Sequence, residues 1–408
     1  EDIKKTKPSL PPQPIYKTAV LGAGVMGAGI AHLFAKKGFD ARIKDISLDA
    51  LEKGMTHIQG LFTKEQRKKR LPNRWTHNQM QHVSFTTQDD GFQRVQVVIE
   101  AIVEDIDIKK TVLGQLAEHV SQDTIIATNT SALSITDIAT AVAHPERVVG
   151  FHFFNPVHRM PLIEIIQGQQ TSEQTLSTAF AFALQIGKTP ILVADRPGFL
   201  VNRILGLYLG EAVRMAEEGI SIGTIDAAME QFGMPMGPFE LLDEVGIDVA
   251  EHVGKFLSSH YDYFPSPSNL LGRLIEKKRL GKKAGMGFYQ HQNGKTKLDH
   301  GWIKQLGLQS KADKEDEAVF KQIADRLVML MANEAFRCLE EKVVRQERDV
   351  DVGMVLGTGF APFRGGLLKY ARSRDLQNVQ SILRALAQQH GTHFAPCAYL
   401  IEQSYRAR

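Results

Sequence analysis

A histidine and a glutamate lie in neighbouring apolar segments of the chain, His152 in RVVGFHFFNP and Glu164 in PLIEII. Hydride removal from a secondary alcohol requires a base for the hydroxyl proton, and imidazole suits that role near neutral pH. A carboxylate in an apolar strand is costly unless it is paired. The two residues therefore predict a catalytic pair in which Glu164 orients His152. Because buried histidines are commonly structural, a core pair remains an alternative.

A glycine motif precedes this pair. The segment TAVLGAGVMGAGIAH contains G-x-G-x-x-G as Gly22, Gly24 and Gly27, directly after an apolar run and before a helical one. Gly22 permits a tight turn, Gly24 lets a diphosphate approach the backbone, and Gly27 lets helix and strand pack closely. Free N–H groups at the helix N-terminus would hold the phosphates. The motif predicts a dinucleotide site, with a glycine-rich turn that binds no ligand as the alternative.

Asp45 ends the next apolar run, ARIKD. A carboxylate at this position can hydrogen-bond both ribose hydroxyls of adenosine and repel a 2′-phosphate. We therefore expect NAD in preference to NADP. Arg42 and Lys44 are neighbouring cations that would attract a 2′-phosphate, so the NADP alternative stays open.

The elements around these residues predict an α/β Rossmann-type doubly wound sheet at 15–195. Its strand-like runs are TAVLG, ARIKD, VVIEA, TIIAT, RVVGFH and LIEII. A polar, Lys- and Arg-rich segment at about 50–85 predicts a helical hairpin inserted after the second strand. Beyond about residue 195 the strand-like runs cease, and we expect nearly all helix.

The helical part contains an internal repeat. Three charged residues recur 123 positions later: Arg203, Glu211 and Arg214 as Arg326, Glu334 and Arg337. Such self-similarity predicts two duplicated all-α domains, at 196–295 and 310–408, with a linker at 296–309 between them. Four prolines among polar residues predict a further extended linker at 1–14.

Composition narrows the class of protein. The 408 residues include 49 Lys and Arg against 46 Asp and Glu, which is not the charge footprint of a nucleic-acid binder. No apolar run has the length of a membrane span, and Cys338 and Cys397 follow no metal-ligand spacing. We expect a cytoplasmic protein without a metal, a nucleic-acid partner or a membrane span.

Five motifs in this order resemble the 3-hydroxyacyl-CoA dehydrogenases of fatty acid β-oxidation: GAGVMGAGIAH, EAIVED, TNTSALSI, GFHFFNPVHRMPLIEII and RPGFLVNRIL. The resemblance runs from about residue 17 to the end. The duplicated helical half is similar to the dehydrogenase part of a multifunctional fatty acid oxidation α subunit, without its enoyl-CoA hydratase/isomerase domain. The resemblance implies NAD-dependent oxidation of (S)-3-hydroxyacyl-CoA to 3-oxoacyl-CoA.

The resemblance also implies roles for single residues. The catalytic pair would be His152 and Glu164, the substrate-polarising residues Ser131 and Asn202, and the residues lining the cofactor Glu104, Lys109 and Asn129. Ser131 has a helix cap as its structural alternative, because Ser before a helix satisfies free N–H groups. Asn202 has a backbone contact at the start of a long helix as its alternative.

Coenzyme A carries phosphate charges, and the run QRKKR in the predicted hairpin offers a basic surface. Lys64 and Lys68, one helical turn apart, are the predicted contacts, with a solvated helix face as the alternative. The resemblance further implies a thiolase β subunit as partner of the full-length complex. It implies no obligate homodimer, since the second helical copy would stand where a partner chain pairs in standalone relatives.

Two rival functions remain open at this stage. One is a catalytically silent NAD-binding or structural relative, and the other is a dehydrogenase of free hydroxy acids. The joint presence of His152, Glu164, Ser131 and Asn202 disfavours the first. Only the hairpin lysines speak against the second.

Overall fold

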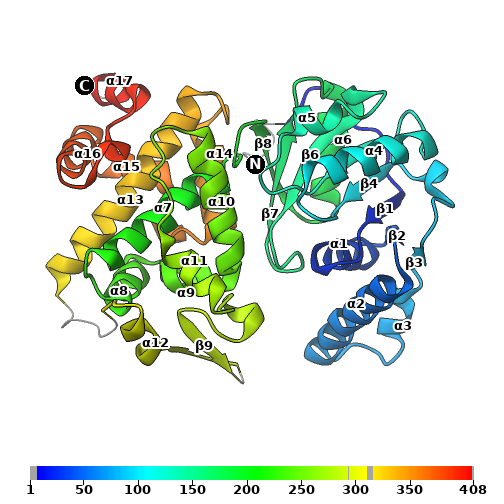
Figure 1. Cartoon of the computed structure of the whole chain (residues 1–408). Coiled ribbons are helices and arrows are strands. Elements are labelled where there is room, and N and C mark those ends of the chain that lie inside the picture. The colour runs from blue at the N-terminus through cyan, green and yellow to red at the C-terminus, as the bar shows by residue number, and fades with distance from the viewer. Residues whose placement is uncertain (1–6, 293, 310–315, 407–408) are drawn as a thin grey trace. The chain divides into compact units, whose positions relative to one another are not determined.

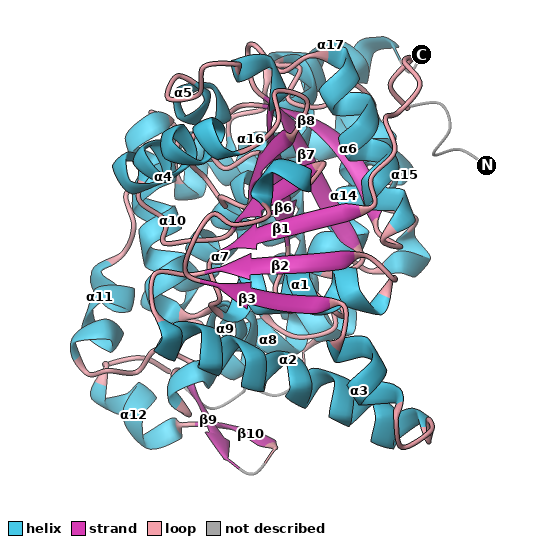
Figure 2. Ribbon diagram, turned by 90° about the vertical axis from the view of Figure 1, so that its right-hand side faces the viewer, coloured by secondary structure: helices cyan, strands magenta, loops and turns pink. Residues whose placement is uncertain are grey.

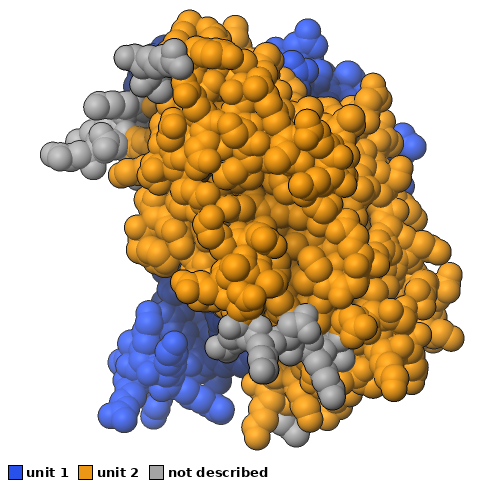
Figure 3. All heavy atoms as spheres, turned by 90° about the vertical axis from the view of Figure 1, so that its left-hand side faces the viewer, with its two compact units in different colours: residues 1–196 blue, residues 197–408 orange. Residues whose placement is uncertain are grey.

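The computed structural model describes residues 7–292, 294–309 and 316–406. The chain divides into two compact units, Glu1–Arg196 and Pro197–Arg408, which Figure 3 colours separately. Parts of three predicted segments lie outside the described residues: 1–6 of the linker, 293 of the first all-α domain, and 310–315 and 407–408 of the second.

The first unit is built on an eight-stranded sheet in the order β3-β2-β1-β4-β5-β6-β7-β8. Its strands are β1 Lys17–Leu21, β2 Asp40–Lys44, β3 Val83–Thr86, β4 Val97–Glu100, β5 Ile125–Thr128, β6 Val148–Phe153, β7 Leu162–Gln167 and β8 Thr189–Ala194. The strands β1 to β6 are parallel, while β7 pairs antiparallel with β6 and parallel with β8. Figure 2 shows β1, β2 and β3 running side by side in one direction. The predicted Rossmann-type sheet is confirmed.

Helices pack on this sheet as its buried strands require. They are α1 Val25–Lys36, α2 Leu48–Lys69, α3 Trp75–Met80, α4 Ile106–His119, α5 Ile135–Ala139 and α6 Glu173–Gln185. Strands β4 and β5 are buried at every residue, the pattern expected when both faces are covered. Helix α1 packs against β1 and β2, and α6 against β6, β7 and β8 (Figure 1).

The segment predicted as a helical hairpin holds α2 and α3, but its last residues form strand β3. The sequence VSFT at Val83–Thr86 pairs parallel with β2 at the edge of the sheet. Ser47 caps the N-terminus of α2, because its hydroxyl accepts a hydrogen bond from the amide of Ala50. The helix packs on α1, where the ring of Phe62 lies 4.3 Å from that of His32.

The described part of the predicted N-terminal linker lies along α6. The amide of Ser9 donates to Oε1 of Glu173 at 3.0 Å, and the amide of Gln13 donates to Oγ1 of Thr178 at 3.1 Å. Hydrogen bonds to α6 therefore fix the path of residues 9–13.

The described residues of the second unit form helices and one short β-hairpin. Its helices are α7 Val201–Glu217, α8 Ile222–Phe232, α9 Pro238–Val245, α10 Ile247–His260, α11 Asn269–Glu276, α12 His300–Gln305, α13 Glu317–Glu340, α14 Glu347–Thr358, α15 Leu367–Ser373, α16 Leu376–His390 and α17 Ala398–Arg406. Strands β9 Tyr289–Gln292 and β10 Lys295–Leu298 pair antiparallel. Gly294, at φ +75°, permits the turn between them. The segment 296–309, predicted as a linker, contains α12 and most of β10.

The repeated residues meet in the middle of this unit, where α7 packs against α13. Nε of Arg203 donates to Oε1 of Glu334 at 2.5 Å, and Nε of Arg326 donates to Oε1 of Glu211 at 2.6 Å. In each pair the arginine comes from one repeat and the glutamate from the other, and all four side chains are buried. One compact unit contains both copies.

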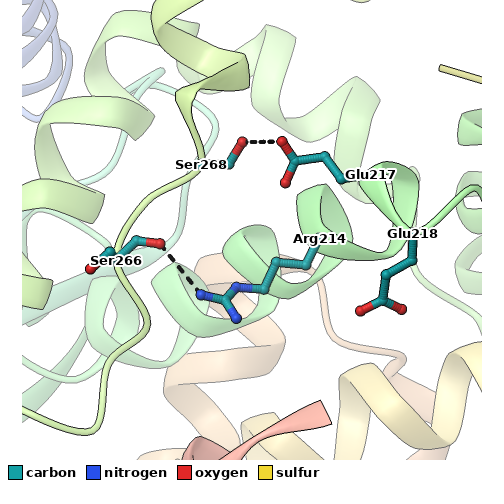
Figure 4. Close-up of a pocket in the computed structure, with 5 residues that line it drawn as sticks. All are labelled: Arg214, Glu217, Glu218, Ser266 and Ser268. Atoms are coloured by element: carbon teal, nitrogen blue, oxygen red, sulfur yellow. Dashed lines mark hydrogen bonds between the residues drawn. The ribbon is translucent and has the colours of Figure 1, made fainter. Parts of the chain in front are cut away.

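The third repeated arginine differs between the copies. Arg337 pairs with Glu334 at 2.5 Å and lies 3.9 Å above the ring of Tyr263. Arg214 donates at 3.4 Å to the carbonyl oxygen of Ser266 and lines a polar hollow (Figure 4). The other residues around the hollow are Glu217, Glu218, Ser266 and Ser268.

Candidate active site

Most of the predicted site residues gather at one edge of the sheet in the first unit. Gly22 follows β1, Asp45 follows β2, Glu104 comes after β4, Asn129 and Ser131 follow β5, and His152 lies near the end of β6. The carboxyl ends of these parallel strands meet at the same edge. Strand order reverses between β1 and β4, and such switch points are where open α/β sheets bind ligands.

The glycine turn has the geometry that a dinucleotide requires. Gly22 has φ +95°, and a Cβ there would lie 2.5 Å from the carbonyl oxygen of Ala101. A Cβ on Gly27 would lie 1.9 Å from the carbonyl oxygen of Gly22. A Cβ on Gly24 would meet no described atom within 4 Å. Helix α1 is described over its whole length, and no side chain caps its N-terminus. Its first backbone amides therefore fit a diphosphate.

Asp45 is held beside this turn. Its Oδ2 accepts a hydrogen bond from the amide of Ala23 and its Oδ1 from that of Ile46, both at 2.7 Å. The neighbouring Lys44 pairs with Asp89, Nζ to Oδ1 2.5 Å. A carboxylate in this place suits the ribose hydroxyls of adenosine, and the paired Lys44 offers a 2′-phosphate less attraction.

A buried charge network joins β4 to the start of α4. Glu100 is fully buried and accepts hydrogen bonds from Nζ of Lys109 at 2.7 Å and Oγ1 of Thr128 at 2.6 Å. Nζ of Lys109 also lies 3.4 Å from Oε2 of Glu104. Lys109 is only 1% exposed, so its position favours holding Glu104 over direct contact with a ligand. Sequence reasoning missed Glu100, although a carboxylate ending the apolar run VVIE gives the same signal as Glu164.

Glu104 in turn holds Ser131. Its Oε1 accepts hydrogen bonds from the amide of Ser131 at 2.7 Å, the hydroxyl of Ser131 at 3.0 Å and the hydroxyl of Thr130 at 2.7 Å. Burial opposes ionisation, but the Lys109 ammonium and these hydrogen bonds keep the pKa of Glu104 below its ordinary value. The N-cap of α5 is Ser134, whose hydroxyl accepts from the amide of Asp137. Ser131 is therefore not the cap of that helix.

Asn129 connects β5 to the end of β6. Its Oδ1 accepts a hydrogen bond from the amide of Phe153 at 2.8 Å, one residue after His152. The side chain thereby fixes the backbone that carries the histidine.

His152 and Glu164 stand directly opposite each other on the antiparallel strands β6 and β7. Nδ1 of His152 lies 2.8 Å from Oε2 of Glu164, with the residues 5% and 0% exposed. Because the carboxylate accepts, Nδ1 is the donor and Nε2 carries the lone pair of the neutral ring. The pair predicted from the two apolar segments is formed, and its geometry suits a general base.

The remaining predicted site residues lie on helices α2 and α7. Lys64 and Lys68 are on the exposed side of α2, and among the described residues neither takes part in an ion pair, whereas Lys69 pairs with Glu65. Asn202 is the second residue of α7 and belongs to the second unit. Their roles stay predictions.

The described part of the chain holds neither a membrane-spanning helix nor a cluster of metal ligands. No helix there has both the length and the apolarity needed to cross a membrane. No group of three or more His, Cys, Asp or Glu residues there is arranged to hold a metal ion.

Comparisons with known proteins identify the family of the chain. Residues 17–196 match the family model of the 3-hydroxyacyl-CoA dehydrogenase NAD binding domain, and residues 198–291 match that of the C-terminal domain. The (S)-3-hydroxybutyryl-CoA dehydrogenase PaaH1 from Ralstonia eutropha is 35% identical, with a TM-score of 0.65 over 69% of this chain and 100% of that one.

Two further solved structures cover nearly the whole chain. The 3-hydroxybutyryl-CoA dehydrogenase from Escherichia coli K12 is 27% identical, with a TM-score of 0.83 over 97% of this chain and 99% of that one. The dehydrogenase part of multifunctional enzyme 1 from C. elegans shares the fold at 24% identity, with a TM-score of 0.69 over 98% and 95%. The chain therefore belongs to the 3-hydroxyacyl-CoA dehydrogenase family and is an NAD-dependent enzyme of that family.

Proposed function

We propose that the enzyme oxidises (S)-3-hydroxyacyl-CoA to 3-oxoacyl-CoA in fatty acid β-oxidation, with His152 as the general base and Glu164 as the residue that orients it. The observation that carries the proposal is the buried contact of 2.8 Å between them. A fully buried carboxylate beside a histidine at the carboxyl end of a parallel strand suits proton removal better than it suits simple core packing.

His152 takes the proton of the 3-hydroxyl at Nε2, because Nδ1 is engaged by Glu164. Glu164 stabilises the imidazolium that forms, and its burial makes that attraction stronger than it would be in water. The nicotinamide, when bound, supplies the acceptor for the hydride from the 3-carbon. Ser131, held by Glu104, and Asn202 hydrogen-bond the reacting oxygen and hold the 3-carbon in place.

The cofactor is held by residues that follow β1, β2, β4 and β5. Backbone amides at Gly24 and the start of α1 hold the diphosphate, and Asp45 binds the adenosine ribose. Lys109 acts through Glu104, and Asn129 acts through the backbone of β6. Because Asp45 occupies the place of the ribose hydroxyls, NAD is preferred over NADP.

Two exposed apolar residues that sequence reasoning missed fit the adenine. Ile46 is 95% exposed after β2, and Val103 is 60% exposed after β4. Apolar side chains so exposed at a ligand-binding edge suit the faces of a planar base.

Lys64 and Lys68 are proposed to attract the phosphates of coenzyme A. In the full-length protein a thiolase β subunit would receive the product. The exchanged Arg–Glu pairs of the two repeats support the absence of an obligate homodimer, because each repeat already has its partner in the same chain. The buried free thiols of Cys338 and Cys397 fit a reducing cytoplasm.

The decisive experiment compares substrates. Purified enzyme with NAD is mixed with (S)-3-hydroxybutyryl-CoA, with its long-chain homologue, or with free 3-hydroxybutyrate, and NADH absorbance is followed. The proposal predicts NADH from the thioesters and none from the free acid. Equal turnover of the free acid would favour a hydroxy-acid dehydrogenase, and NAD binding without turnover of any thioester would favour a silent relative.

A further inference from the structure

The strands β6 and β7 carry both members of the catalytic pair and are joined by a short loop, residues 154–161. Inside this loop the amides of Arg159 and Met160 both donate to the carbonyl oxygen of Pro156, at 2.9 and 3.1 Å. His152 and Glu164 meet because they are directly opposite in the antiparallel register. A shift of one strand along the other would separate them, so the loop that joins the strands controls the geometry of the pair.

A buried lysine holds this loop from one side. Lys188 precedes β8 and is 7% exposed. Its Nζ donates to the carbonyl oxygen of Val157 at 2.5 Å and to that of Met160 at 2.6 Å. Burial, and then the charges of Lys37 and Lys36, lower the pKa of Lys188 to about 8. Both hydrogen-bond acceptors are backbone groups of the loop, and neither supplies the negative charge that would compensate a buried ammonium.

Helix α1 holds the loop from the other side. The side chain of Val157 is 2% exposed and packs on α1 at Gly29, where an added Cβ would lie 3.2 Å from Cγ2 of Val157. The N-terminus of this same helix forms the dinucleotide turn. The loop is therefore fixed between Lys188 and the helix that leads away from the cofactor site.

We propose that Lys188 is a positioning residue for the dehydrogenase reaction. Its two hydrogen bonds hold residues 154–161 and so keep His152 in register with Glu164 and in a fixed relation to α1. This inference rests on the proposed role of His152 as the base. Loss of the two hydrogen bonds should slow the chemical step and leave cofactor binding intact, because the hydrogen bonds described for Asp45 and for Lys188 involve different groups.

The test compares Lys188→Met, which keeps most of the side-chain volume without donors, with Lys17→Met, which removes an exposed lysine of β1 in the same unit. Three quantities are measured on folded protein: kcat with (S)-3-hydroxybutyryl-CoA, the Kd of NAD, and amide hydrogen exchange of the peptide spanning 154–161. We expect Lys188→Met to lower kcat about 10-fold, since small displacements of reacting groups have effects of this size or larger. The NAD Kd should stay within about 2-fold, and exchange in the loop should accelerate. Lys17→Met should resemble the wild type in all three.

The inference is overturned if Lys188→Met keeps the wild-type kcat, or if kcat falls only in proportion to the loss of folded protein. Should Lys188→Met fail to fold, Lys188→Gln replaces it, because Gln keeps polarity but reaches less far and carries a single donor group. A folded Lys188→Gln with wild-type kcat overturns the inference, and one with lowered kcat and unchanged NAD Kd supports it. His152→Ala in the same assay separates the two proposals: its full activity would remove the catalytic role of His152, whatever Lys188 does.

Discussion

Arg203 and Glu334 form a buried ion pair at 2.5 Å that recurs with exchanged partners as Arg326 and Glu211 at 2.6 Å. Each repeat supplies the cation of one pair and the anion of the other. Replacing one member of either pair would take a buried charge away from its partner in the other repeat, and breaking a buried ion pair is strongly destabilising. The second unit is thus held together by reciprocal pairing between its two copies.

Arg203→Met should therefore destabilise the second unit. Removing one partner of a buried pair costs up to about 3–5 kcal/mol, and here Glu334 would keep only Arg337 of its two arginines while Glu341 would lose its arginine. Arg214→Met is the matched control on the same helix, since the hydrogen bond of Arg214 to the carbonyl oxygen of Ser266 is long, at 3.4 Å. Urea unfolding followed by circular dichroism measures both variants, and equal losses would contradict the role given to the exchanged pairs.

Asp45→Ala should lower kcat/KM for NAD and reduce the ratio of kcat/KM with NAD to kcat/KM with NADP. The loss of charge-assisted hydrogen bonds to ribose corresponds to about 10- to 100-fold in kcat/KM. The exposed Asp90→Ala on the same side of the sheet is the control. Steady-state kinetics with both cofactors decide the matter, and an unchanged ratio of the two kcat/KM values would remove Asp45 from the cofactor site.

Lys68→Glu should raise KM for acyl-CoA about 10-fold and leave the NAD Kd unchanged, because it reverses a charge proposed to face the phosphates of coenzyme A. The effect should shrink as salt is added. Lys53→Glu, on the same helix α2 but paired with Asp49, is the control. Identical KM values for the two variants would mean that Lys68 belongs to a solvated helix face.

Asp226 should make the stability of the second unit depend on pH. Burial raises the pKa of Asp226 to about 7, although its carboxylate accepts hydrogen bonds from Tyr289 and the amide of Phe239. The folded protein keeps a proton on Asp226 that the unfolded chain releases above about pH 4. The contribution of this proton to the free energy of unfolding is therefore full below about pH 4 and is lost as pH rises through about 7.

Asp226→Asn cannot lose that proton. Relative to the wild type, the variant should therefore gain at least about 1 kcal/mol of unfolding free energy between pH 5 and pH 8. Denaturant unfolding at both pH values measures the difference, with the exposed Asp262→Asn as control. A difference that does not change with pH would show that Asp226 does not titrate in this range.

The sequence predicted the sheet and the dinucleotide turn because buried parallel strands leave nearly continuous apolar runs. It did not predict β3 or β8. The sequence VSFT of β3 is short and only partly buried at the sheet edge, and TPILVA of β8 begins with a Thr-Pro pair typical of a turn. The pairing of His152 with Glu164 could be predicted because a buried carboxylate needs a partner.

Contacts between residues far apart in the sequence could not be predicted in the same way. Lys188 sits in the sequence GKTP, which suggests an exposed turn, and only the fold brings it to the loop at 154–161. The repeat placed Arg203 and Arg326 in equivalent positions, but which glutamate each one meets depends on how α7 packs against α13. Ser131 resembled a helix cap until the structure assigned the cap of α5 to Ser134.

The most direct test of the account is a single-turnover measurement of NADH formation from (S)-3-hydroxybutyryl-CoA with excess enzyme and saturating NAD, comparing the wild type with His152→Gln and Glu164→Gln. The account predicts that His152→Gln slows the hydride-transfer step at least about 100-fold and that Glu164→Gln slows it substantially, with the NAD Kd unchanged in both. A wild-type rate in His152→Gln would contradict the assignment of His152 as the base.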